Sequence, residues 1–175
     1  REVETGRGRP AVALGVRAAA HFVAGMKLSD REHTAVIVDF AGNLVADVAQ
    51  PRRPGALELP ALLDATEALV QEVCAKAGLT PSALTAVGLG VPGFVDAEAG
   101  MVHWSPILST RQVALAASAS ARLRLPVHID NDANLVTLAE LWFGAGRHLS
   151  DFAVVTTPSD FSLRCRAERS IPTKL

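Results

Sequence analysis

The segment "VHIDNDANLVTLAELWFGAG", residues 127–146, passes from an alternating strand pattern into a helical one within a few residues. We expect residues 127–130 to form a strand and residues 132–144 to form a helix. The helix is apolar nearly all round, which predicts a buried position. A strand that ends at Asp130 and Asn131 delivers polar side chains to the carboxyl edge of a sheet, where α/β proteins bind ligands.

The residues at this junction allow two interpretations. A carboxylate at Asp132 can accept a sugar hydroxyl proton during phosphoryl transfer if it lies within hydrogen-bond reach. Asn131 offers both a donor and an acceptor for sugar hydroxyls. Alternatively, one of the two residues only caps the helix, since Asn and Asp are preferred at that position. The spacing by itself favours the cap.

The rest of the chain repeats the same alternation of strands and helices. We expect strands at 21–28, 33–40, 44–50 and 84–91, and helices at 57–78 and 111–125. The resulting order β-β-β-α-β-α-β-α predicts an α/β fold, with a mixed sheet covered by helices on both faces. That order is typical of a ribonuclease-H-like or actin-like ATPase lobe. Such lobes usually come in pairs, with the ligand in the cleft between them.

Three regions follow from this pattern. Residues 1–20 are rich in Gly, Arg, Pro and Ala and are interpreted as a connector, and residues 21–148 form the first lobe. Residues 149–175 begin a second lobe, with a strand at 151–157, but most of that lobe is missing from the sequence. After Thr157 the periodicity fails, which predicts a disordered tail. A frameshift or fusion scar is the alternative explanation for this stretch.

Composition excludes several classes of protein. The 175 residues are 49% hydrophobic with a net charge of −1, which argues for a globular chain and gives no overall signal for nucleic acid or membrane. The two cysteines form no CxxC pair and the five histidines show no ligand spacing, so neither a metal site nor a disulfide framework is expected. No signal peptide or membrane-length apolar run is present, which favours a cytoplasmic protein.

Two further stretches could contact a ligand. "GLGVPGFVD", residues 88–96, contains Gly90 and Gly93, which let the backbone approach a ligand closely, although an ordinary tight turn has the same composition. "GRGRP", residues 6–10, contains arginines that suit the narrow minor groove of DNA, although a solvated basic tail is an equal alternative.

The stretches "TAVGLGVPGFVDAEAGMVHWSPIL" (85–108) and "LPVHIDNDANLVTLAELWFGAG" (125–146) resemble the ROK family, named for repressors, open reading frames and kinases. The resemblance implies a fold of two ribonuclease-H-like lobes. It also implies sugar binding by Gly93, Asn131 and Asp132. In the family's kinases, the residue matching Asp132 is the general base.

The chain departs from the kinase pattern at several positions. The kinases carry Asp-x-Gly-Gly-Thr after the first strand, whereas this sequence has "KLSDR" at 27–31. The second phosphate motif, Leu-Gly-Thr-Gly, corresponds to "TPSD" at 157–160, and Ile107 replaces a usual Asn. The family's zinc-binding cysteines and its sugar-contacting Glu and His are absent from the sequence. Neither ATP nor zinc is therefore expected as a cofactor, and enzymatic activity is disfavoured.

The N-terminus is similar to the end of the winged helix-turn-helix that ROK repressors carry. The resemblance implies that Arg7 and Arg9 contact DNA, while the helix-turn-helix itself is missing. We therefore interpret the chain as part of a transcriptional regulator that senses a sugar or sugar derivative and that forms a homo-oligomer at full length. The alternatives are a sugar kinase with a degenerate phosphate loop, using Asp132 as base, and a fragment without function.

Overall fold

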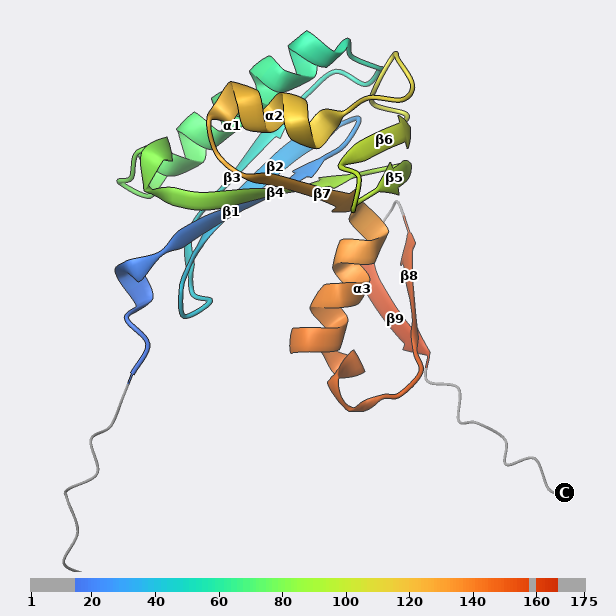
Figure 1. Ribbon diagram of the computed structural model, residues 1–175. Helices are drawn as coiled ribbons and strands as arrows, with labels where there is room; N and C mark the ends of the chain where they lie inside the picture. The colour runs from blue at the N-terminus through green and yellow to red at the C-terminus, as the bar shows by residue number, and fades with distance from the viewer. Residues whose placement is uncertain (1–14, 158–159, 167–175) are drawn as a thin grey trace, which may run out of the picture.

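The computed structural model describes residues 15–157 and 160–166 (Figure 1). The chain up to the end of the mixed sheet contains the elements η1 Ala18–Ala20, β1 Phe22–Leu28, β2 Glu32–Asp39, β3 Leu44–Pro51, α1 Leu59–Lys76, η2 Pro81–Ala83, β4 Leu84–Val91, β5 Phe94–Asp96, β6 Met101–Trp104, α2 Leu115–Leu123 and β7 Val127–Asn131. It is followed by α3 Asp132–Phe143, η3 Ala145–His148, β8 Ala153–Thr157 and β9 Asp160–Arg166.

The central element is a five-stranded mixed sheet in the order β3-β2-β1-β4-β7. Strands β1, β2 and β3 form an antiparallel meander, while β4 pairs parallel to β1 and β7 pairs parallel to β4. A strand that joins a sheet in parallel needs a crossover connection. Helix α1 lies in the connection that leads from β3 to β4, and α2 lies in the connection that leads from β4 to β7. The predicted order of the helices and of the strands in this sheet is therefore confirmed.

The sequence pattern missed one hairpin. It predicts a loop over residues 92–100, but β5 begins at Phe94 and pairs antiparallel with β6. The two strands have three and four residues, which is too short to establish an alternating pattern. This hairpin leads the chain away from the end of β4 and back toward α2.

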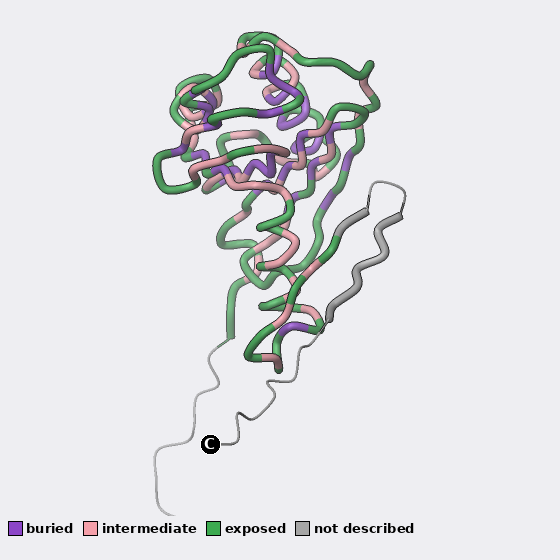
Figure 2. Tube along the Cα trace, turned by 90° about the vertical axis from the view of Figure 1, so that its right-hand side faces the viewer, coloured by how far each residue is buried: buried purple, intermediate pink, exposed green. Residues whose placement is uncertain are grey.

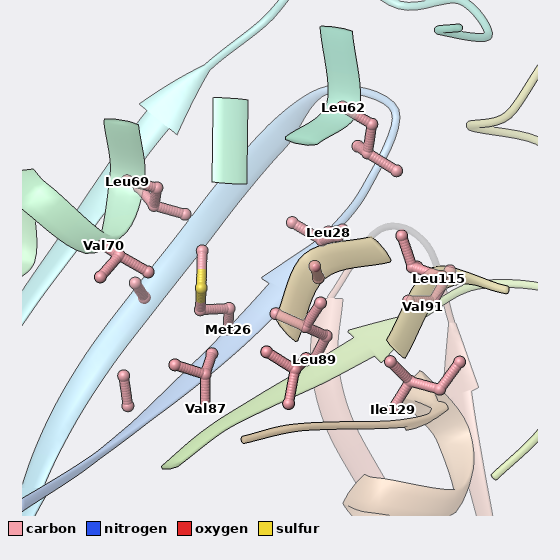
Figure 3. Close-up of a cluster of buried hydrophobic side chains, with 14 of the residues drawn as sticks. Met26, Leu28, Leu62, Leu69, Val70, Val87, Leu89, Val91, Leu115 and Ile129 are labelled. Atoms are coloured by element: carbon pink, nitrogen blue, oxygen red, sulfur yellow. The ribbon is translucent and has the colours of Figure 1, made fainter. Parts of the chain in front are cut away.

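The core lies between the sheet and the two helices α1 and α2, which cover the same face (Figure 1). In β1, Ala24, Met26 and Leu28 are buried at every second position, as a strand with one covered face requires. Leu62 of α1 and Leu115 of α2 are fully buried above them. Figure 3 shows Met26 and Leu28 of the sheet facing Leu62 and Leu115 of the helices.

Helix α3 contradicts the prediction that it is buried. None of its residues is buried, and Trp142 and Phe143 are 62% and 78% exposed. It leaves the end of β7 on the face of the sheet opposite α1 and α2, and touches that face only near its own N-terminus. The expectation of helices over both faces is thus wrong for most of the second face, where Val23 and Val36 are partly exposed.

Figure 2 makes the same division visible, with buried segments in the sheet and its covering helices and exposed or intermediate segments along α3. Sequence periodicity reports which residues are apolar, but burial also needs a neighbouring surface. Glu140, within α3, accepts a hydrogen bond at Oε2 from Ala145 N at 2.9 Å.

Residues 160–166 form a strand where the sequence predicts a disordered tail. Strand β9 pairs antiparallel with β8, from Ala153 opposite Arg166 to Thr157 opposite Asp160. The expectation of a disordered tail is therefore wrong for residues 160–166, since backbone pairing needs no apolar period. Residues 158–159 and 167–175 lie outside the described residues. Across the described parts of the chain, no helix has the length and apolar character needed to cross a membrane.

Candidate functional site

The predicted ligand residues meet at the carboxyl ends of β4 and β7. The two strands pair in parallel register, with Val91 opposite Asn131, so both end at the same edge of the sheet. Gly93 is the second residue after the end of β4, and Asp132 begins α3 directly after β7. The structure therefore brings Gly93, Asn131 and Asp132 together, as expected from the strand order. We call these three residues the strand-end site.

Asn131 uses both ends of its side-chain amide. Its Oδ1 accepts hydrogen bonds from Ala133 N at 2.9 Å and Asn134 N at 3.3 Å, which makes Asn131 the N-cap of α3. Its Nδ2 donates to Gly93 O at 2.8 Å. The cap interpretation is thus confirmed for Asn131, and the same side chain also fixes the position of the Gly93 loop.

The two neighbouring carboxylates have different surroundings. Asp130 Oδ1 accepts from its own neighbour Asn131 N at 2.6 Å and from Asn134 Nδ2 at 3.0 Å. Asp132 Oδ1 accepts from Ala133 N at 3.1 Å, while Asp132 Oδ2 accepts no hydrogen bond from any described residue. Asp132 is half-buried at the N-terminus of α3, where the helix dipole favours a negative charge. Its Oδ2 is therefore available to a hydroxyl group.

Gly93 is held in a conformation that no other residue adopts easily. Its φ is +123°, and a Cβ at this position would lie 2.2 Å from Trp104 O and 2.9 Å from Ser105 Cα. Contacts at these distances cannot be tolerated, so the loop requires glycine for space as well as for conformation. The backbone at the end of β6 thus presses directly against the strand-end site.

Sequence reasoning missed the contribution of Ser105. This side chain is 1% exposed, donates from Oγ to Pro92 O at 2.6 Å, and accepts from Ile107 N at 3.3 Å. It ties the loop that contains Gly93 to the end of β6. A buried hydroxyl in the "WSPIL" stretch carries no periodic signal, so only the fold could identify this role.

The stretch that replaces the family's first phosphate loop forms a closed turn between β1 and β2. Ser29 Oγ donates to Glu32 O at 2.5 Å and accepts from Glu32 N at 3.2 Å. Ser29 N donates to His33 Nδ1 at 3.2 Å, and Arg52 Nη1 donates to Ser29 O at 3.1 Å. We call residues 29–32, with these contacts, the Ser29 turn. All the polar groups of Ser29 are engaged inside the protein.

His33 supports the turn from the core side of the sheet. It is 2% exposed and shares the buried face of β2 with Ala35 and Ile37. Burial, which disfavours the charged ring, and the nearby Arg52 guanidinium hold the pKa of His33 below its usual value, against a smaller opposing effect of the Glu32 backbone. The alternation of 33, 35 and 37 was the signal that could have identified it as a core residue.

Arg7 and Arg9 lie outside the described residues. Among the residues that the structure describes, no group of three or more His, Cys, Asp or Glu side chains could hold a metal ion.

Comparison with known proteins reveals relatives of two kinds. The chain is 31% identical to the xylose repressor of Caldicellulosiruptor bescii over 82% of its length, and 30% identical to the DNA-binding transcriptional repressor Mlc of Escherichia coli over 83%. It is also 31% identical to the glucokinase of Streptomyces coelicolor over 70% of its length. In each case the chain spans about 36% of the relative.

The similar solved structures also include both transcriptional regulators and sugar kinases. A ROK family transcriptional regulator, a homologue of Escherichia coli Mlc, superimposes with a TM-score of 0.66 at 26% identity, over 85% of this chain and 37% of that one. A ROK family glucokinase from Streptomyces griseus, in complex with glucose and AMPPNP, superimposes with a TM-score of 0.64 at 28% identity, over 76% and 40%. The predicted actin-like ATPase fold is confirmed by these neighbours.

The model of the ROK family matches residues 23–158, which include nearly all of the mixed sheet, the strand-end site and the Ser29 turn. The chain therefore belongs to the ROK family.

Proposed function

We propose that this chain forms the sugar-sensing part of a ROK-type transcriptional regulator, in which sugar binding controls DNA binding. The observation that carries the proposal is the closed Ser29 turn. Phosphate groups are usually held by free backbone N–H groups in glycine-rich loops. In this turn, Ser29 N is already bonded to His33, and the side chains of Asp30 and Arg31 stand where the family's kinases have glycine and threonine.

The sugar part of the proposal rests on the strand-end site. Asp132 Oδ2 is available as an acceptor, and Asn131 Nδ2 retains a second N–H besides the one that it donates to Gly93. The glucokinase from Streptomyces griseus was solved with glucose, which supports a small sugar as the ligand class. Sugar sensing by this site needs no nucleotide or metal, so we propose that the chain uses no cofactor.

The DNA part of the proposal rests on the relatives named as repressors and on the basic N-terminal stretch. We propose that Arg7 and Arg9 approach DNA in the context of a winged helix-turn-helix, as the resemblance implies. A regulator of this type would act in the cytoplasm and as a homo-oligomer. The switch requires that the sugar binds one conformation of the protein more tightly than the other.

A sugar kinase is the second candidate. Asp132 at the start of α3 favours it, since a carboxylate with one unengaged oxygen can act as a general base. The glucokinase relatives also favour it. The Ser29 turn opposes it, because phosphoryl transfer depends mainly on positioning and neutralising the phosphates.

Both functions can be tested on the 175-residue chain. Trp142→Phe leaves Trp104, whose backbone contacts the Gly93 loop, as the single fluorescent indole. We expect glucose or xylose to change the Trp104 emission saturably, and Asp132→Asn to weaken binding at least about tenfold, which corresponds to about 1.4 kcal/mol for a hydrogen bond to a charged group. The matched control, Asp151→Asn, replaces an exposed carboxylate away from the site and should leave binding unchanged.

Phosphorylation of glucose, measured with ATP and Mg²⁺, provides a positive test for the kinase candidate. The regulator proposal expects saturable sugar binding without product. Asp132-dependent formation of a sugar phosphate would instead establish the kinase. Sugar binding that is equal in the Asp132→Asn and Asp151→Asn variants would contradict the assignment of the site.

A further inference from the structure

The Ser29 turn depends on one buried imidazole. His33 Nδ1 accepts the Ser29 N–H at 3.2 Å, so Nδ1 carries its lone pair and the ring proton of neutral His33 lies on Nε2. Nε2 is buried and has no hydrogen-bond partner among the described residues. The ring's hydrogen bond to Ser29 N is therefore the polar contact by which His33 helps to close the turn, beside the bonds of Ser29 to Glu32 and Arg52.

Protonation of His33 is incompatible with this arrangement. The imidazolium carries a proton on both nitrogens, so Nδ1 would face the Ser29 N–H as a second donor. The new charge would also be buried and would lie near the Arg52 guanidinium, which donates to the carbonyl of the same Ser29. Each of these effects favours an open turn when the ring is charged.

The charged groups around His33 do not offset this effect. Arg52, which follows β3, is the side chain whose charge acts on the ring. The Glu32 backbone favours the charged ring, but this effect is smaller than those of burial and Arg52. From α1, Glu72 is engaged by Gln50 Nε2, and Gln50 is the register partner of His33 in β3. In the turn itself, the exposed Asp30 and Arg31 carry opposite charges. No carboxylate of the described residues is bonded to the buried Nε2.

We propose that His33 is a proton-operated latch for the Ser29 turn, closed when the ring is neutral and released when it is charged. Release frees the Ser29 N–H at the carboxyl end of β1 and loosens the Leu28–His33 pairing near the start of β2. The latch lies in the stretch that replaces the first phosphate loop of the family's kinases. Its operation is independent of whether the protein senses a sugar.

NMR titration of the 175-residue chain from about pH 8 to about pH 5, on either side of the ordinary histidine pKa, tests the latch. We expect the ¹⁵N shifts of neutral His33 to show the tautomer protonated on Nε2, and the pKa of His33 to lie below the ordinary histidine value. The Ser29 amide should shift with the same midpoint as His33. Its exchange with solvent, after correction for the intrinsic pH effect, should accelerate about tenfold or more as one hydrogen bond of about 1.4 kcal/mol is lost.

Three variants sharpen the result. His33→Gln removes the titratable ring but keeps an acceptor oxygen at this position, so it should abolish the pH dependence of the Ser29 amide. His21→Gln, which alters an exposed histidine, should leave that dependence unchanged. Arg52→Gln, which keeps a donor but removes the charge, should move the His33 midpoint upward.

The proposal is overturned if neutral His33 carries its proton on Nδ1, or if the Ser29 amide does not follow the His33 titration. A Ser29 transition that persists in His33→Gln would also overturn it. If His33→Gln does not fold, the wild-type titration and Arg52→Gln still decide between these outcomes.

Discussion

Asn131 Nδ2 donates to Gly93 O at 2.8 Å, which joins two residues 38 positions apart that resemblance had assigned separately to the sugar site. The same side chain caps α3 through Oδ1. A single amide therefore sets both the start of the helix and the position of the loop after β4. Any ligand that touches Asp132 would approach a surface whose geometry Asn131 maintains.

Replacing Asn131 should separate these two roles. Asn131→Ala removes the cap and the bond to Gly93, and we expect a loss of about 2 kcal/mol in the free energy of unfolding. Asn131→Asp keeps the capping oxygen but turns a donor toward Gly93 O into an acceptor, so it should retain the cap, lose the bond to the loop and add repulsion between the two oxygens. Urea denaturation measures both changes. Equal stability of Asn131→Ala and the wild type would show that neither bond contributes.

Gly93 should tolerate no side chain. In Gly93→Ala, the Cβ would meet Trp104 O at 2.2 Å in a backbone conformation with φ of +123°, so we expect a destabilisation of about 3 kcal/mol. Gly42→Ala is the matched control, because φ is +82° there but nothing lies within 4 Å of the added Cβ. The control isolates the conformational cost, of about 1 kcal/mol. Similar losses in both variants would contradict the steric account.

The exposure of α3 predicts that its leucines contribute little to stability. Leu62→Ala in α1 should cost about 3 kcal/mol, since this side chain is fully buried between helix and sheet. Leu138→Ala in α3, where the side chain is 38% exposed, should cost less than about 1 kcal/mol. Thermal or urea denaturation of the same chain compares them. A large loss at Leu138 would indicate that α3 is covered in solution.

Stability should depend on pH through His33. The pKa of His33 is lowered in the folded protein, mainly by burial, so the unfolded chain takes up a proton at higher pH than the folded chain does. The stabilisation is therefore fully present above the unfolded pKa of about 6.5, and it is lost as the pH falls through that value toward the folded pKa. Denaturant titrations between about pH 5 and pH 8 should show this slope.

Replacing His33 should reduce the pH dependence of the free energy of unfolding. His33→Gln cannot titrate, so its stability should change less than that of the wild type across the same range. The pKa of Asp39 is lowered by hydrogen bonds from the Asn43 side chain and backbone, so its stabilising effect is present throughout this range and is lost only in more acidic solution. Asp39 therefore does not interfere with the His33 slope. A wild-type stability that stays flat across the whole range would contradict the assignment.

Much of the fold could be predicted from local pattern. The alternation in β1 and β2 and the apolar spacing of α1 each identify an element, because one covered face imposes a period of two or of about 3.6 residues. The start of α3 at Asn131 could also be predicted from the sequence, since a helix cap is a contact between residues two and three positions apart. These features depend on neighbours in the chain, so amino-acid order was enough to predict them.

Contacts between distant segments emerge only once the chain is folded. The burial of α3 failed as a prediction because its apolar residues need a covering surface, and the described chain gives them little. The bond from Asn131 to Gly93, the Ser105 tie and the arrangement of His33 and Arg52 around Ser29 each require separate strands to end beside one another. Amino-acid order fixes what each segment can form, while packing fixes which polar atoms meet.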